Sequence, residues 1–260
     1  VMAYLLVRQS VLGRLGDIQS GISLLDNPLA KMDLPERLIT ATSLVGLYLQ
    51  KLLVPHPLLS ERGYSTTAEV GLSDPGFWIS LLLLVAAVYG LVRLTAKKHL
   101  LGFALLFFGA TFSIFSNLIL VIGSPYGERF LYMPSLGFCL ALSWGLAQLG
   151  RSSGVPQSPR QFLRTFRRPL LYLLPILLIY AGLTLSRNPD WKNSFTLYKA
   201  DVHKAPDCAK LHYHLGLEYN KRSQLPENRN RQPEMLNSAV QELQTALSIY
   251  PKYSDAYAQL

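Results

Sequence analysis

An acidic and a basic residue stand side by side, Glu128 and Arg129, in the stretch GSPYGERFLYMPSLGFC that covers 123–139. Glu128 is the only acidic residue between Asp74 and Asp190, and long apolar segments flank the pair. Ionisable groups at membrane depth are costly and often functional. An arginine there can hold a phosphate bidentately, and a glutamate can orient the arginine, act as a base or bind a metal. The alternative is a pair that caps helix ends and contacts lipid headgroups.

Other polar residues give weaker signals. We interpret Tyr132 as an interfacial aromatic, and Asn117 as the donor of a hydrogen bond between helices. His56 lies between two prolines, and a single histidine in a turn is seldom catalytic. Cys139 and Cys208 lack the spacing of metal ligands, so we expect no metal site. The sequence has no Gly-rich phosphate loop and no Ser-His-Asp order.

Apolar helices must position the Glu-Arg pair. Of the 260 residues, half are hydrophobic and 16% are charged, with a mean hydropathy of +0.21. A bilayer core needs about 20 mainly apolar residues per helix. An all-α polytopic membrane region is therefore predicted, with spans at 76–94, 99–122, 130–149 and 169–187. The segment 36–54 is either another span or a helix at the interface, which gives about five or six spans once the apolar start of the chain is included.

Basic loops predict the orientation of these spans. Cationic residues surround 93–98 and fill the linker 150–168, so both should be cytoplasmic. The loop 123–129 and everything after 187 then lie on the opposite side. If 36–54 spans the membrane, the loop with Asp17, Asp26 and Asp33 is cytoplasmic. The charged residues that give the net charge of +9 lie at the ends of spans. Because this position explains the charge, we expect no nucleic-acid partner.

The last part of the chain resembles a tetratricopeptide repeat (TPR). We predict two domains, a transmembrane domain at 1–187 and a repeat region at 188–260. Small residues let paired helices approach, and each pair buries its face against a neighbour. The polar stretch SQLPENRNRQPE exceeds the usual repeat spacing and is expected to bulge as a loop. The residues expected to pack the repeat are Leu215, Gly216, Tyr219, Ala239, Leu243, Ala246 and Pro251.

The motif GERFLYMPSLGFC resembles the hallmark of the transmembrane and tetratricopeptide-repeat O-mannosyltransferase family, ER-x-LY-x-PS-x-G-[FY]-C. The NPL loop at 27–29, the segment LLVPHPLLSERGYS and the junction WKNSFTLYKADVHKAPDCAKLHYHLG also fit this family. The order of elements fits as well, because many spans and a linker precede a last span and the repeats. The residues of the motif resemble those of bacterial homologues more than those of animal members.

This resemblance implies a glycosyltransferase of the GT-C type that takes a sugar from a polyprenyl-phosphate carrier. The sugar would pass to Ser or Thr of a protein on the periplasmic or lumenal side, where the repeats hold the acceptor. The resemblance assigns Arg129 to the lipid phosphate and Glu128 to orienting it, with Tyr132 nearby. No separate cofactor is certain. The membrane would be a bacterial inner membrane or, in a eukaryote, the endoplasmic reticulum.

The ends of the chain limit this interpretation. It begins at Val1 inside an apolar run and ends at Leu260 in mid-repeat, so we expect a fragment. The acidic residues that serve as base in GT-C enzymes would lie upstream, and this segment alone should be inactive. The competing hypothesis is a non-catalytic scaffold that anchors repeats at a membrane to bind other proteins.

Overall fold

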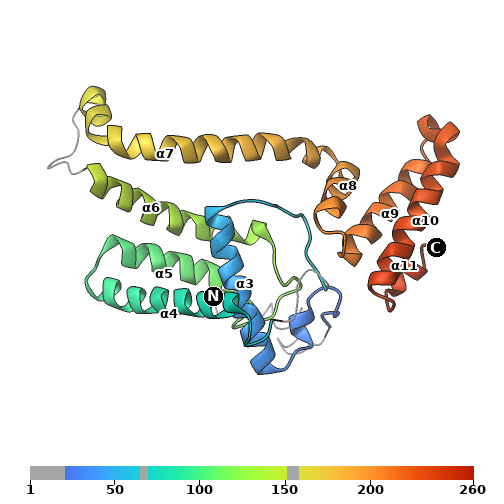
Figure 1. Ribbon diagram of the computed structural model, residues 1–260, viewed down its shortest axis with the longest axis horizontal. Coiled ribbons are helices and arrows are strands. Elements are labelled where there is room, and N and C mark those ends of the chain that lie inside the picture. Colours follow the sequence, from blue (N-terminus) through green and yellow to red (C-terminus); the bar gives the residue numbers. More distant parts are fainter. Residues whose placement is uncertain (1–20, 65–69, 151–157) are drawn as a thin grey trace, which may run out of the picture.

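The computed structural model describes residues 21–64, 70–150 and 158–260, and the secondary structure of these residues is all-α. The predicted helical fold is confirmed. The apolar start of the chain and Asp17, which carried predictions, lie outside the described residues. In Figure 1, a layer of long helices occupies one side, and the C-terminal helices α8–α11 form a separate group at the other.

Four apolar helices make up the layer: α4 (Pro75–Ala96), α5 (Leu100–Ser113), α6 (Pro134–Gly150) and α7 (Pro159–Arg187). They run side by side in Figure 1. Within the described part of the chain, two helices are long and apolar enough to cross a membrane, Pro75–Ala96 and Pro169–Lys192. Only 11% and 6% of their apolar windows are buried. Such exposure of Leu, Val and Ile side chains supports a membrane protein, since a soluble fold would have to cover them.

Two of the predicted boundaries differ from the structure. The second half of the predicted linker 150–168 is helical, because α7 begins at Pro159 and continues through Pro169 and Pro175. Prolines are tolerated inside membrane helices, where neighbouring groups satisfy the freed carbonyls. The predicted span 99–122 is too long, because α5 ends at Ser113 and the chain then follows turns and bends.

Asn117 stabilises the loop that follows α5. Its backbone is left-handed, with φ of 57°, a conformation that asparagine tolerates better than most residues. Its buried side chain donates to Pro125 O at 3.1 Å and accepts from Ile122 N at 3.1 Å. The amide therefore satisfies backbone groups of its own loop. The expected hydrogen bond between helices is wrong.

Helix α3 (Leu34–Leu53) runs crosswise to α4 and α5 in Figure 1. It passes α4 closely at Gly46, where a Cβ atom would lie 1.9 Å from Ser80 Oγ. Both flanks of α3 reach the α5–α6 connection. Before it, Asn27 Nδ2 donates to Ile122 O at 2.7 Å, and after it, Leu59 N donates to Glu128 Oε1 at 3.3 Å.

Helix α3 thus lies across one end of the layer, as an interfacial helix would, and does not run along it. The loop that contains Asp26 is at the same end as Glu128. The prediction that placed Asp26 on the cytoplasmic side, opposite Glu128, depended on 36–54 spanning the membrane, and both stay predictions. The 3-10 turn η1 (Pro28–Ala30) in the NPLA segment starts at Asn27, whose Oδ1 accepts from Leu29 N at 3.0 Å.

The C-terminal group follows a 3-10 segment, η3 (Asn188–Lys192), and consists of α8 (Ser194–Lys204), α9 (Ala209–Ser223), α10 (Gln232–Ile249) and α11 (Ser254–Tyr257). Gly216 allows α9 and α10 to touch, since a Cβ there would lie 2.9 Å from Leu243 Cγ. Leu215, Gly216, Ala239, Leu243 and Ala246 are buried, Tyr219 is half-buried and packs edge-on against Phe195, and Pro251 is exposed.

The long polar stretch between α9 and α10 is ordered as helix. Residues Pro226–Arg231 form a 3-10 segment, η4, and Gln232 begins α10 with Pro233 in its first turn. Proline fits the first turn of a helix because its missing N–H would have no partner there. The expectation of a bulging loop is therefore wrong.

Candidate functional site

The Glu-Arg motif lies on a short 3-10 segment, η2 (Glu128–Leu131), between α5 and α6. Tyr48 of α3 holds the residues that precede η2. Tyr48 Oη accepts from Gly127 N at 3.0 Å, and its ring stacks on Tyr126 with centroids 4.3 Å apart. Both tyrosines are almost fully buried. The segment before Glu128 is therefore held against α3 by a hydrogen bond and a ring stack.

A cavity of about 530 Å³ opens beside η2, between α3, α6 and α7. Three cationic side chains line it, Lys51, Arg129 and Arg187, with Glu128 as the acidic residue. Its aromatic wall consists of Tyr132, Tyr180 and Trp191. Glu128, Arg129, Arg187 and Trp191 also line a second cavity of about 240 Å³ with the loop 58–60.

The site residues predicted from the sequence thus meet in one cavity, but they do not pair with one another. Tyr132 is 81% exposed. Arg129 is exposed, with its guanidinium 5.0 Å from the Phe130 ring centroid. Among the ion pairs of the described residues none joins Glu128 to Arg129. Since Arg129 has no ion-pair partner in the part of the chain that the structure describes, its N–H donors are available for a ligand.

Glu128 is held by the backbone instead. Its Oε1 accepts from Leu59 N at 3.3 Å. Burial raises the pKa of the Glu128 carboxyl, while the Leu59 N–H and the charges of Arg62 and Lys51 oppose the shift, and the net direction is upward. A carboxyl of raised pKa in a cavity can exchange a proton nearer to neutral pH than an ordinary glutamate.

Two cations that the sequence analysis did not single out complete the lining. Lys51 Nζ is buried and donates to His56 O at 2.7 Å. His56 itself is exposed. Arg187 ends α7, and its guanidinium contacts Asp190 and Asp201, each at 2.6 Å. A sequence signal for Arg187 existed, because it stands three residues before Asp190 at the end of a span, the spacing of a helical ion pair.

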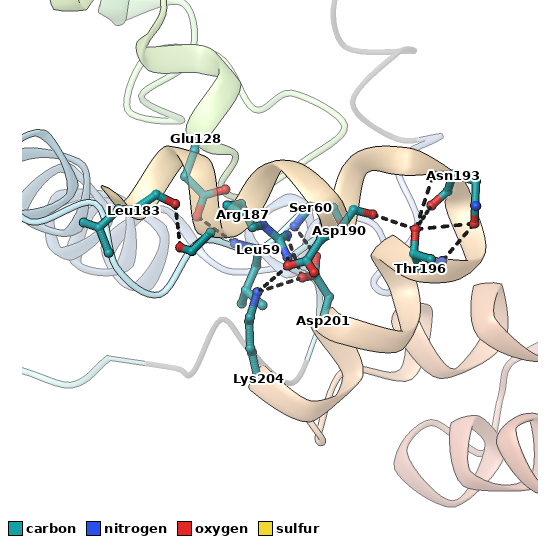
Figure 2. A network of polar contacts seen from close by, with 11 residues as sticks. Leu59, Ser60, Glu128, Leu183, Arg187, Asp190, Asn193, Thr196, Asp201 and Lys204 are labelled. Atoms are coloured by element: carbon teal, nitrogen blue, oxygen red, sulfur yellow. Dashed lines mark hydrogen bonds and ion pairs between the residues drawn. The ribbon is translucent and has the colours of Figure 1, made fainter. Parts of the chain in front are cut away.

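Figure 2 shows how this ion-pair network meets Glu128 through the loop 58–60. Ser60 N donates to Asp201 Oδ2 at 2.7 Å, and the preceding amide, Leu59 N, donates to Glu128. Asp201 belongs to α8 and is fully buried. Two consecutive amides therefore connect a carboxylate of the apolar layer to a carboxylate of the C-terminal group.

A second contact joins the same two parts. Lys210 of α9 lies 2.6 Å from Asp26 Oδ1 and 3.4 Å from Glu61 Oε1. Both acidic residues belong to loops that flank α3. The C-terminal helices are thus fixed against the end of the layer where the cavity opens. In the part of the chain that the structure describes, no group of three His, Cys, Asp or Glu residues could hold a metal ion.

No family model and no solved structure matches this chain. Several curated proteins are similar in sequence to this chain. The chain is 32% identical over 197 residues to "Protein O-mannosyl-transferase Tmtc3" of Drosophila melanogaster, which covers 74% of this chain and 20% of that protein. It is 29% identical over 182 residues to "Protein O-mannosyl-transferase TMTC1" of Mus musculus, with 70% and 17% covered. For "Protein O-mannosyl-transferase tmtc2" of Xenopus laevis the identity is 31% over 140 residues, with 54% and 16% covered.

The chain belongs to the transmembrane and tetratricopeptide-repeat O-mannosyltransferase family. The family resemblance of the GERFLYMPSLGFC motif is confirmed by these relatives. The chain spans about a fifth of the length of the curated relatives it matches. A bacterial source stays a prediction.

Proposed function

We propose that the whole protein is a membrane O-mannosyltransferase that takes a mannose-like sugar from a polyprenyl- or dolichyl-phosphate carrier. The sugar passes to a Ser or Thr hydroxyl of an acceptor protein on the periplasmic or lumenal side. The membrane region is multi-pass, and the repeat region presents the acceptor. The names of the relatives support the reaction class, and the cavity beside η2 supports the donor class.

The observation that carries the proposal is the set of three cations, Lys51, Arg129 and Arg187, in one cavity at the end of an apolar helix layer. In sugar transfer the acceptor oxygen attacks the anomeric carbon, and the carbon–oxygen bond to the carrier phosphate breaks. The electron pair stays on the phosphate, which gains negative charge. Fixed cations stabilise that charge where it develops.

We assign the roles within the cavity from these contacts. Arg129 contacts the phosphate, because it is exposed and its donors have no ion-pair partner in the described residues. Arg187 lines the cavity from α7, where Asp190 and Asp201 hold its guanidinium in place. Glu128 keeps the η2 segment against Leu59, and Tyr132 offers an aromatic face for the sugar or the first isoprene unit. We assign the proton acceptor of the reaction to no residue of this chain.

The test uses full-length protein in detergent and radiolabelled mannosyl phosphate on a dolichyl or bacterial polyprenyl carrier. Arg129→Ala should lower transfer about 30- to 100-fold, which corresponds to the loss of one charge-assisted contact of about 2–3 kcal/mol. Glu128→Gln should lower it less, because glutamine keeps an acceptor for the Leu59 amide. Arg93→Ala is the control, since Arg93 is exposed at the far end of α4.

Full activity in both Arg129→Ala and Glu128→Gln would show that the motif is only a helix cap. Absence of transfer by wild-type protein with either carrier, together with binding of partners to the repeat, would instead favour the membrane-anchored scaffold.

A further inference from the structure

A cationic cleft lies in the C-terminal group, away from the cavity beside η2. It has a volume of about 350 Å³ and is enclosed by α8, α9, η4 and α10. Lys199, Arg222 and Arg231 line it, each from a different element. Below, "the cleft" means this cavity.

The polar stretch that departs from the usual repeat spacing builds one wall of the cleft. Asn228 and Arg231 of η4 and Met235 of α10 line it. Asn228 Nδ2 donates to Arg222 O at 2.9 Å, which attaches η4 to the end of α9. The extra residues therefore form an ordered wall.

The positive charge of the cleft is largely uncompensated. Arg231 lies 3.4 Å from Glu234, and both side chains are more than two-thirds exposed, so this pair is weak. No ion pair of the described residues involves Lys199 or Arg222. Lys199 and Arg222 thus face the cleft without an ion-pair partner among the described residues, and the one acidic residue of the lining, Glu234, balances only part of the positive charge. A cleft with excess positive charge attracts an anionic ligand.

Arg222 is held in place before any ligand binds. Its guanidinium lies 4.1 Å from the Phe195 ring centroid, and its Nη2 donates to Asn193 Oδ1 at 3.0 Å. Tyr219 packs edge-on against Phe195 with centroids 5.0 Å apart. A fixed arginine loses little conformational freedom on binding, and its planar group matches a carboxylate with two donors.

We propose that the cleft binds an acidic segment of a polypeptide chain. The paired donors of Arg222 and Lys199 fit carboxylates, and the half-buried Met235 and Tyr219 offer apolar contact to a neighbouring side chain. The Phe195 face is already covered by Arg222, so it is not free to stack a nucleic-acid base. The wall contributed by η4, PENRNR, is polar and unsuited to insertion among lipids. This binding does not depend on the transfer reaction.

The experiment measures fluorescence anisotropy of a labelled ten-residue Asp/Glu-rich peptide with one Leu and one Thr, added to the full chain in detergent. The control peptide replaces each acid with its amide. Lys199→Gln and Arg222→Gln should each weaken binding about tenfold, as expected for loss of one charged contact. The matched control is Lys221→Gln, which makes the same charge change at an exposed neighbour that does not line the cleft.

Lys199 is exposed, so its variant keeps the test valid if Arg222→Gln unfolds the end of α8. The proposal is supported if the acidic peptide binds Lys221→Gln as tightly as wild type and binds Lys199→Gln and Arg222→Gln more weakly. Equal affinity of all variants, equal loss in Lys221→Gln, or equal binding of the amide peptide overturns it. Binding to vesicles of anionic lipid or to inorganic phosphate, without binding of the peptide, also overturns it.

Discussion

Replacing Asp201 by Asn should test the connection between the two parts of the molecule. Asp201 is fully buried, lies 2.6 Å from Arg187 Nη2 and accepts from Ser60 N at 2.7 Å. Asparagine keeps an oxygen for Ser60 but removes the charge. Breaking a buried ion pair costs about 3–5 kcal/mol. We expect the lower end, about 3 kcal/mol, because Asp190 still contacts Arg187.

Asp201 also lies 3.6 Å from Lys204 Nζ. The matched control is Asp190→Asn, which removes a negative charge beside the same two cations, Arg187 and Lys204. Asp190 has a side chain that is 27% exposed, so we expect about 1 kcal/mol or less. Thermal unfolding of the full chain in detergent should give a decrease of about 6–10 °C for Asp201→Asn and at most about 3 °C for Asp190→Asn.

Hydrogen exchange supplies the second readout. The amides of Leu59 and Ser60 should exchange faster in Asp201→Asn than in Asp190→Asn, since the acceptor of Ser60 is weakened and the loop loosens. The reasoning is refuted if the two variants lose equal stability, or if exchange at these two amides stays at its wild-type rate in Asp201→Asn.

Three further predictions concern other contacts. Burial lowers the pKa of His212, but the Glu242 carboxylate 2.6 Å from Nδ1 and a backbone carbonyl outweigh it and raise the pKa above its ordinary value. This stabilisation is full below the unfolded pKa of about 6.5 and is lost as pH rises through the folded pKa. The free energy of unfolding should therefore decrease as pH rises above about 6.5 in wild type, and thermal unfolding at a series of pH values should show no such decrease in His212→Gln. Gly216→Val should destabilise α9–α10 packing by about 1–3 kcal/mol, because a Cβ would lie 2.9 Å from Leu243 Cγ; unchanged thermal unfolding would contradict this. Asn27→Ala should cost about 2–4 kcal/mol by leaving buried backbone groups without partners, and a melting point within a degree of wild type would show that water replaces the amide.

Apolar runs predicted the long helices well, because a helix in lipid needs an uncharged stretch and little else. The predicted span 99–122 was too long for the same reason, because composition does not reveal that Asn117 has a backbone of positive φ and binds its own loop. The interpretation of α3 depended on long-range contacts. Only the structure shows that both of its flanks reach the α5–α6 connection.

The candidate site was partly predictable. Glu128 and Arg129 could be found because charge is rare in such a sequence, and they do line the cavity. The hydrogen-bond partner of Glu128 could not be found, since Leu59 contributes a backbone N–H, which every residue except proline has. The role of Asp201 could not be predicted either, because its partner Ser60 lies 141 residues away in the sequence.

The consecutive amides of Leu59 and Ser60 set a spacing between the two carboxylates that they bind. Neighbouring Cα atoms are about 3.8 Å apart across a trans peptide, and this distance cannot stretch. The two N–H donors therefore stay close together, and the loop limits how far Glu128 and Asp201 can move apart while both keep their amides. One residue inserted between Leu59 and Ser60 would move the two donors apart by about one peptide unit and should weaken at least one of the two hydrogen bonds. Substitutions in this loop should therefore be tolerated more readily than any change in its length.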